Sequence, residues 1–242
     1  WGLSVSPRHF AEHVEVIRKY FHPLSMPEFV KHLQRGKMPN RSIVITFDDG
    51  YADNLHNAKP MLERYDIPAT IYLVTEALVE KRNFWWDDLE SVLLQPDHLP
   101  ESLELNLHGS QYSWQLGNAR RYTTADRQND RQLRPWNASP GTRMAFFYAV
   151  WQQLRQLSKP ERLEAIEMIR DLAGIPQKGQ NAARILTKEE LHRLENGSLI
   201  ELGAHTVTHP SLPTLSAGQQ IEEIVGGKAQ LESILGHPVT SF

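Results

Sequence analysis

The stretch Ser42-Ile-Val-Ile-Thr-Phe-Asp-Asp-Gly-Tyr51 places two carboxylates directly after a short β-branched run. A continuous apolar run of this kind predicts a strand from Ser42 to Phe47 that is covered on both faces in a parallel sheet. Gly50 marks the turn after the strand, and α/β enzymes tend to carry their chemistry in the loops at strand ends. We therefore expect Asp48 and Asp49 to lie at the edge of a sheet.

A second group of polar side chains follows another predicted strand. Leu199-Ile-Glu-Leu-Gly-Ala204 reads as a strand, and it leads directly into His205-Thr-Val-Thr-His209. One carboxylate with two imidazoles gives three protein ligands and leaves an open position, which is the arrangement that lets Zn²⁺ hold and acidify a water. Because neighbouring residues on a strand face opposite sides, the two aspartates are expected to have separate tasks, and the second carboxylate can act as a base.

The segments around these motifs predict alternating helices and strands. Residues 54–65 have apolar side chains at helical spacing and are followed by Ile67-Pro-Ala-Thr-Ile-Tyr-Leu-Val74, so this part reads as a βαβ unit in a parallel sheet. Further helices are predicted by caps and capping boxes, and a last strand is predicted to begin near the end of the chain. The N-cap residues of these helices are Ser6, Ser25, Thr187 and Ser216, and the last strand spans Val239 to Phe242.

Between about residues 77 and 183 the pattern changes to polar segments with few strand signals and two clear helices. These helices are predicted to open at Ser139-Pro140 and at Ser158, and they could form a helical hairpin. We therefore predict a helix-rich insertion. The predicted division is 1–76 for the N-terminal helices and first βαβ part, 77–184 for the insertion, and 185–242 for the continuation of the sheet.

Composition excludes several classes of protein. The 242 residues carry a net charge of −3 with acids and bases interspersed, so no field of one sign attracts nucleic acid. The absence of cysteine excludes thiol nucleophiles and zinc-thiolate sites, but it leaves the compartment open. The apolar runs are far shorter than the roughly 20 residues that cross a bilayer, so no transmembrane segment is expected. The chain begins with Trp1 rather than Met and is expected to be a piece of a longer protein.

Two motifs, Thr46-Phe-Asp-Asp-Gly50 and His205-Thr-Val-Thr-His-Pro210, resemble those of the polysaccharide deacetylase family, also called the NodB-homology domain or carbohydrate esterase family 4. The resemblance covers roughly residues 40–75 and 185–242. It implies an α/β fold, a partial and distorted (β/α) barrel, here with the helix-rich insertion. It also implies that Asp48 is the catalytic base and that Asp49, His205 and His209 are the metal ligands.

The function implied is a metal-dependent hydrolase that removes N- or O-linked acetyl groups from a polysaccharide or glycoconjugate. The expected cofactor is a divalent metal, with zinc preferred and cobalt, nickel and iron as alternatives. The expected partner is an acetylated glycan, and the sequence does not identify which one or the oligomeric state. The family resemblance points to the cell envelope or an extracellular location, with the cytoplasm left open. The family's later motifs, including its general acid, would lie beyond Phe242.

Other interpretations account for less of the pattern. A glycosidase needs two carboxyl groups about 5 to 9.5 Å apart, which adjacent residues on a strand do not readily supply, and it leaves the histidines unexplained. Phosphatases of the haloacid-dehalogenase type require Asp-x-Asp-Gly, which this chain lacks. The alternative that stays open is a glycan-binding domain that keeps the metal without catalysis. We expect structural roles for Asp53, as a helix cap, for the aromatic run at residues 84–86, and for the remaining histidines.

Overall fold

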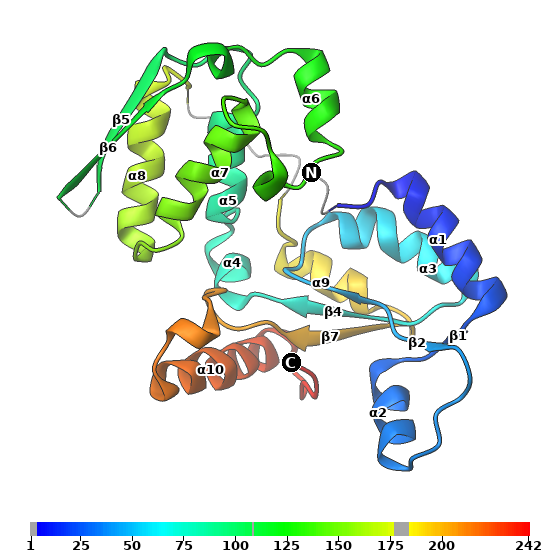
Figure 1. Cartoon of the computed structure of the whole chain (residues 1–242). Helices are drawn as coiled ribbons and strands as arrows, with labels where there is room; N and C mark the ends of the chain where they lie inside the picture. The colour runs from blue at the N-terminus through cyan, green and yellow to red at the C-terminus, as the bar shows by residue number, and fades with distance from the viewer. Residues whose placement is uncertain (1–3, 108, 177–183) are drawn as a thin grey trace. The chain divides into compact units, whose positions relative to one another are not determined.

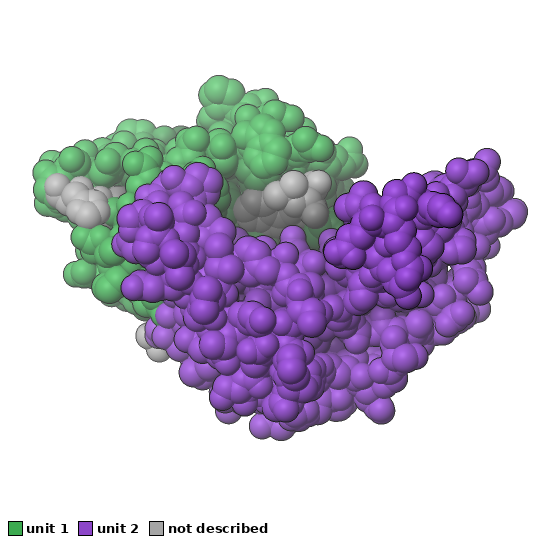
Figure 2. Space-filling model, turned by 90° about the horizontal axis from the view of Figure 1, so that it is seen from below, with its two compact units in different colours: residues 1–5, 83–182 green, residues 6–82, 183–242 purple. Residues whose placement is uncertain are grey.

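The computed structural model describes residues 4–107, 109–176 and 184–242, and it separates into two compact units (Figures 1 and 2). One unit comprises residues 1–5 and 83–182, and the other comprises residues 6–82 and 183–242. The three-part division predicted above, with boundaries at 77 and 184, stays a prediction. Of that predicted insertion, His108 and residues 177–183 lie outside the described residues.

A three-stranded parallel sheet organises the second unit. Its order is β3 (Thr46–Phe47), β4 (Ala69–Leu73) and β7 (Ile200–Ala204). Every residue of β4 is buried, because this strand lies between the other two and its apolar side chains are covered on both faces. The register pairs Phe47 with Ile71 and Ala204 with Leu73, so the carboxyl ends of all three strands lie at one edge.

The predicted continuous strand from Ser42 to Phe47 is wrong in detail. The run is divided into β2 (Ser42–Ile43) and β3, because each half pairs with a different partner. β2 pairs in parallel with β1 (His22–Pro23), while β3 pairs with β4. Neither short strand is fully buried. The fold class is nevertheless confirmed as α/β with open sheets, consistent with a distorted barrel.

Four helices of this unit begin where their caps predict. Capping boxes open three of them, and a serine cap opens α1. The helices are α1 (Pro7–Tyr20), α2 (Met26–Gln34), α3 (Lys59–Tyr65), α4 (Thr75–Glu80), α9 (Lys188–Glu195) and α10 (Ala217–Leu235). α3 is preceded by a π-helical turn, Asn54–Ala58, and Asp53 makes no side-chain cap there, so the predicted cap is wrong. Residues 239–242 form no strand, although the Ala204 amide donates to the Ser241 carbonyl over 3.0 Å.

The first unit is built on α5 (Trp85–Leu93), against which α7 (Arg143–Leu154) and α8 (Lys159–Leu172) both pack. It also contains α6 (Thr124–Asp130) and an antiparallel hairpin of β5 (Ser102–Leu107) and β6 (Ser110–Gln115). The hairpin was not predicted from the sequence. α7 begins four residues after Ser139 because Thr142 is its cap, and its hydroxyl accepts a bond from the Ala145 amide.

The aromatic run at the start of α5 has the structural role that we predicted. Phe84 is buried, Trp86 stacks on it with ring centroids 4.4 Å apart, and Trp85 packs against the apolar core of the unit. A buried arginine completes this core. The Arg143 guanidinium donates to backbone carbonyls that include Leu93 and Arg120, and burial lowers its pKa to about 10.

Candidate metal centre

The two predicted motifs meet at the carboxyl edge of the three-stranded sheet. Asp48 and Asp49 follow β3, and His205 follows β7. β4 separates these strands, and the His205 amide donates to the Leu73 carbonyl at its end over 2.9 Å. The topology therefore brings together residues that are more than 150 positions apart in the sequence.

A tight turn fixes the direction of residues 48–52, which we call the aspartate loop, at this edge of the sheet. The Gly50 amide donates to the Asp48 carbonyl over 2.9 Å, which closes a three-residue turn with Asp49 at its centre. Asp49 has φ +74°, the positive φ of a γ-turn that is rare and strained in proteins. Gly50 also has φ +78°, and a Cβ there would lie 2.6 Å from the Leu73 side chain. A side chain at position 50 would be strained at this φ and would also require the Leu73 side chain to move, so glycine suits this turn.

Three side chains converge on one point. The candidate ligand atoms of Asp49, His205 and His209 all lie within 4.8 Å of one another, and in the described part of the chain no other cluster of His, Asp or Glu does so. Asp49 Oδ1 lies 3.2 Å from Nε2 of His209 and 3.7 Å from Nε2 of His205. The two imidazole rings are 5.1 Å apart.

The donor set fits a divalent cation. Asp49 Oδ1 is buried, and among the described residues it accepts no well-aligned hydrogen bond. Burying a carboxylate oxygen without a hydrogen bond lowers the stability of the fold. A cation shared with the two imidazoles would remove the cost, and one oxygen with two nitrogens is a donor set that zinc accepts. Cobalt, nickel and iron accept similar donors, so the donor set does not select the metal.

The two imidazoles are electrostatically different. Burial lowers the pKa of His205, and His209 lowers it further against the opposing effect of the two aspartates. Burial also lowers the pKa of His209, but the Asp49 carboxylate beside it outweighs that effect, and the net shift is upward. A metal ligand must be the neutral imidazole. Protons therefore compete with a cation mainly at His209, while His205 is neutral over a wider range of pH.

Asp48 differs from Asp49 in its surroundings. Asp48 is exposed, whereas the side chain of Asp49 is only 21% exposed. Both carboxylates nevertheless act on the pKa values of the two histidines. An exposed carboxylate beside a buried ligand can exchange a proton with a substrate or water without giving up a coordination bond.

Residues 184–186 also hold the aspartate loop in place, through backbone hydrogen bonds. Residues 184–186 pair with residues 50–52: the Ala52 amide donates to the Arg184 carbonyl over 2.8 Å, and the Leu186 amide donates to the Gly50 carbonyl over 3.0 Å. Arg184 also makes a bidentate ion pair with Glu190, at 2.6 and 2.7 Å, and His56 lies 3.0 Å from the same carboxylate. This cluster fixes the segment to the start of α9.

Replacing Glu190 with Gln is expected to lower the free energy of unfolding at pH 7 by about 1–3 kcal/mol. This range follows from the lowered pKa of Glu190, because each pKa unit of difference between the folded and unfolded states corresponds to about 1.4 kcal/mol. The hydrogen bonds from Arg184 lower the pKa of Glu190 from 4.5 to about 2. A depressed carboxyl pKa stabilises the fold above pH 4.5, and this contribution is lost as the pH falls towards 2. Urea unfolding at pH 7 and pH 2.5 measures the difference. Glu15→Gln, at an exposed position of α1, is the control, and an equal effect of both substitutions at pH 7 would contradict the expectation.

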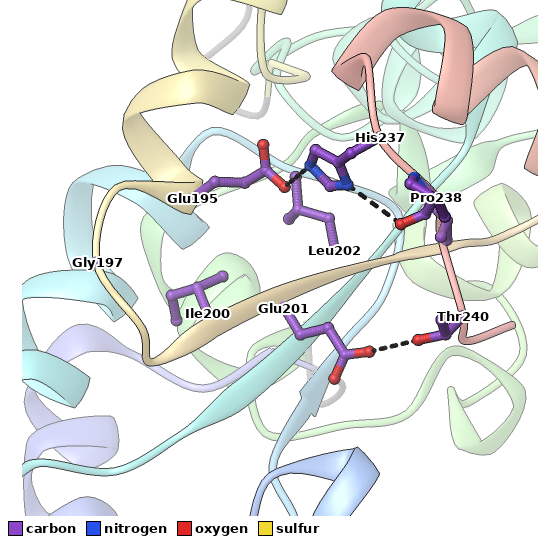
Figure 3. Close-up of a pocket in the computed structure, with 9 residues that line it drawn as sticks. Glu195, Gly197, Ile200, Glu201, Leu202, His237, Pro238 and Thr240 are labelled. Atoms are coloured by element: carbon purple, nitrogen blue, oxygen red, sulfur yellow. Dashed lines mark hydrogen bonds and ion pairs between the residues drawn. The ribbon is translucent and has the colours of Figure 1, made fainter.

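A pocket of about 410 Å³ lies elsewhere in the same unit, against β7 (Figure 3). None of the four predicted site residues lines it. His237 lies 2.9 Å from Glu195 and 3.1 Å from the Pro238 carbonyl, and Thr240 donates to Glu201 over 3.3 Å. The His237 imidazole and the Thr240 hydroxyl already make these contacts. The sheet edge is therefore a better candidate for the functional site than this pocket.

Two supports of the site were missed in the sequence. Glu190 was noticed only as a capping-box residue, and nothing in the sequence linked it to Arg184 or His56. Glu223 lies in the middle of α10, where a charged residue on a helix normally predicts only a solvated face. Glu223 accepts hydrogen bonds from the backbone of residues 205–209, which we call the histidine loop, and this contact depends on how α10 packs. The remaining histidines except His108, which lies outside the described residues, contribute to no further metal cluster in the described ranges.

Comparison with known proteins identifies relatives of this chain. The family model described as polysaccharide deacetylase matches residues 35–132 and 151–242. The match extends into the central segment, so the expected limits of 40–75 and 185–242 were too narrow. The poly-beta-1,6-N-acetyl-D-glucosamine N-deacetylase of Staphylococcus epidermidis is 37% identical over 75 residues, which are 31% of this chain and 26% of that protein. The putative polysaccharide deacetylase YxkH of Bacillus subtilis is 28% identical over 111 residues, or 43% of this chain and 40% of that protein.

The fold is shared with a solved deacetylase. The Streptococcus pyogenes deacetylase PplD in complex with acetate superposes with a TM-score of 0.51 at 16% identity, covering 97% of this chain and 60% of that chain. The matched segments therefore span less than two thirds of these relatives' own lengths. In the described residues, no helix is both long and apolar enough to cross a membrane. The family match covers well over half of the residues, and the chain belongs to the polysaccharide deacetylase family.

Proposed function

We propose that this chain contributes the metal ligands and the general base of a hydrolase that removes acetyl groups from a polysaccharide or glycoconjugate. The observation that carries the proposal is the convergence of Asp49, His205 and His209 within 4.8 Å at the edge of the sheet, beside Asp48. The names of the relatives favour a polymer of N-acetylglucosamine as the first substrate to test.

Each residue has a task in that reaction. Asp49, His205 and His209 would hold a divalent cation, which when bound acidifies water and polarises a carbonyl group. Asp48 accepts a proton at a carboxylate oxygen from the attacking water, because it is exposed and lies next to the ligand set. The tight turn at Gly50 keeps the base and the ligand in one loop with fixed directions. The products are acetate and an amine or hydroxyl group on the sugar.

Acetate release by the full-length protein tests this function. The substrates are N-acetylated glucosamine oligosaccharides and O-acetylated xylan oligosaccharides, assayed before chelation with dipicolinate, after it, and after addition of zinc. We expect chelation to abolish release and zinc to restore it. Release that is unaffected by complete metal removal would contradict the mechanism. Bound zinc without release from any acetylated glycan would instead support the non-catalytic glycan-binding alternative.

A further inference from the structure

The histidine loop has a backbone conformation that needs support from outside the loop. Thr206 has φ +67° and His209 has φ +59°, and a β-branched residue such as Thr206 rarely adopts this left-handed region. Within the loop, the Thr206 hydroxyl accepts a bond from the His209 amide over 3.0 Å. The Thr206 hydroxyl also donates to the His205 carbonyl, but neither bond engages the amides of Val207 and Thr208, which lie between the two candidate ligands.

Glu223 of α10 engages both of those amides. Its Oε2 accepts hydrogen bonds from the backbone N–H of Val207 over 2.8 Å and of Thr208 over 2.9 Å. Its Oε1 accepts a third bond from the Thr208 hydroxyl over 2.7 Å. Two successive amides directed at one carboxylate form an anion-binding nest, and hydrogen bonds to a charged acceptor are among the strong ones.

The packing of α10 places Glu223 at this position. Gly227 lies one helical turn further along the same face, and a Cβ there would lie 2.7 Å from the carbonyl carbon of Thr206. On the other side of the loop, the Glu76 amide at the start of α4 donates to the Val207 carbonyl over 2.9 Å. The loop is therefore held between two helices, and Glu223 supplies the side-chain bonds from α10.

We propose that Glu223 is a positioning residue that holds the histidine loop so that His205 and His209 face Asp49. Glu223 binds no metal in this arrangement, because both of its carboxylate oxygens are directed at the loop. Its effect on a cation is indirect, through the directions of the two imidazoles. The metal part of this inference rests on the proposed function above, whereas the loop part concerns the fold alone.

Hydrogen exchange in the metal-free, full-length protein tests the loop part. In Glu223→Gln, we expect the amides of residues 207 and 208 to exchange at least about tenfold faster, because one charged acceptor of both is lost. Thr208→Val removes only the hydroxyl bond and is expected to have a smaller effect in the same direction. Glu222→Gln, at the exposed neighbouring position, is the matched control and should leave exchange unchanged. Equal exchange in Glu223→Gln and Glu222→Gln would overturn the proposal.

Zinc titration of the same proteins tests the metal part. Loss of a supporting contact typically lowers metal affinity about 10- to 100-fold, and we expect this for Glu223→Gln. Saturating zinc should then restore most of kcat, which a general loss of folding would not allow. Parent-like zinc affinity in Glu223→Gln would overturn the Glu223 proposal alone. A parent protein that binds no zinc would instead overturn the proposed function, while the exchange experiment still decides the role of Glu223 in the loop.

Discussion

Replacing His209 with Ala is expected to lower zinc affinity more than about a hundredfold, beyond the range seen when only a supporting residue is lost. The site has three protein ligands, and His209 is the imidazole nearest to Asp49, at 3.2 Å. Without it, one imidazole and one carboxylate remain, and two ligands hold zinc poorly. Calorimetric titration of the full-length protein with zinc measures the affinity, and acetate release should be lost in parallel.

His237→Ala is the matched control for this prediction. His237 lies in the same unit but in the separate pocket, where it pairs with Glu195. Its removal should leave zinc affinity and acetate release close to those of the parent. If His209→Ala bound zinc as tightly as His237→Ala, the histidine loop would not be part of the metal site.

Replacing Asp48 with Asn is expected to lower acetate release about 10²- to 10⁴-fold, the usual contribution of a general base. The amide has the size of the carboxylate but cannot take a proton from the attacking water. Because Asp48 is exposed and Asp49 supplies the buried oxygen at the ligand cluster, zinc affinity should change little. The fall should appear in kcat at saturating substrate, with zinc content measured on the same samples.

Asp53→Asn separates the role of Asp48 from a general effect of charge near the loop. Asp53 is also exposed, and it lies five residues further along the chain. It should retain nearly full acetate release. An Asp48→Asn protein that keeps parental turnover would remove the general base from the mechanism. A loss of zinc in Asp48→Asn would reassign that residue to the ligand set.

The parts of the fold that depend on local chemistry could be predicted from the sequence. The cap at Ser6 and the capping boxes at Ser25, Thr187 and Ser216 all open helices where expected, because these bonds join residues three positions apart. β4 and β7 were also predicted within two residues at each end, since each is a short apolar run bounded by turn signals.

The features that depend on a distant partner could not be predicted. The run from Ser42 to Phe47 reads as one strand, but β1 and β4 each pair with half of it, and neither partner can be inferred from the run itself. The apolar residues at helical spacing in α2 would be expected to face the core, but they are partly exposed, with Leu33 63% accessible. The hairpin of β5 and β6 is different, because it is a local feature that was missed although the alternating polar and apolar residues of β5 (Ser102–Leu107) are a strand signal.

The candidate site shows the same contrast. A metal site is suggested by the residue types of Asp49, His205 and His209 and by the order of their motifs along the chain, which is that of the family. The convergence of the three side chains, however, depends on β3, β4 and β7 being adjacent and parallel. The residues that hold the two loops of the site in place are even harder to predict from the sequence. The contacts of Glu223 with the histidine loop and of Arg184 with Glu190 arise from packing that no local spacing encodes.

A crystal structure of the full-length protein soaked with zinc, with anomalous data at the zinc edge, tests the central claim most directly. We predict one anomalous peak at about 2.0 to 2.2 Å from an Asp49 oxygen and from Nε2 of both His205 and His209. A catalytically active crystal with its zinc bound by other residues, or with no zinc at this sheet edge, would contradict the account.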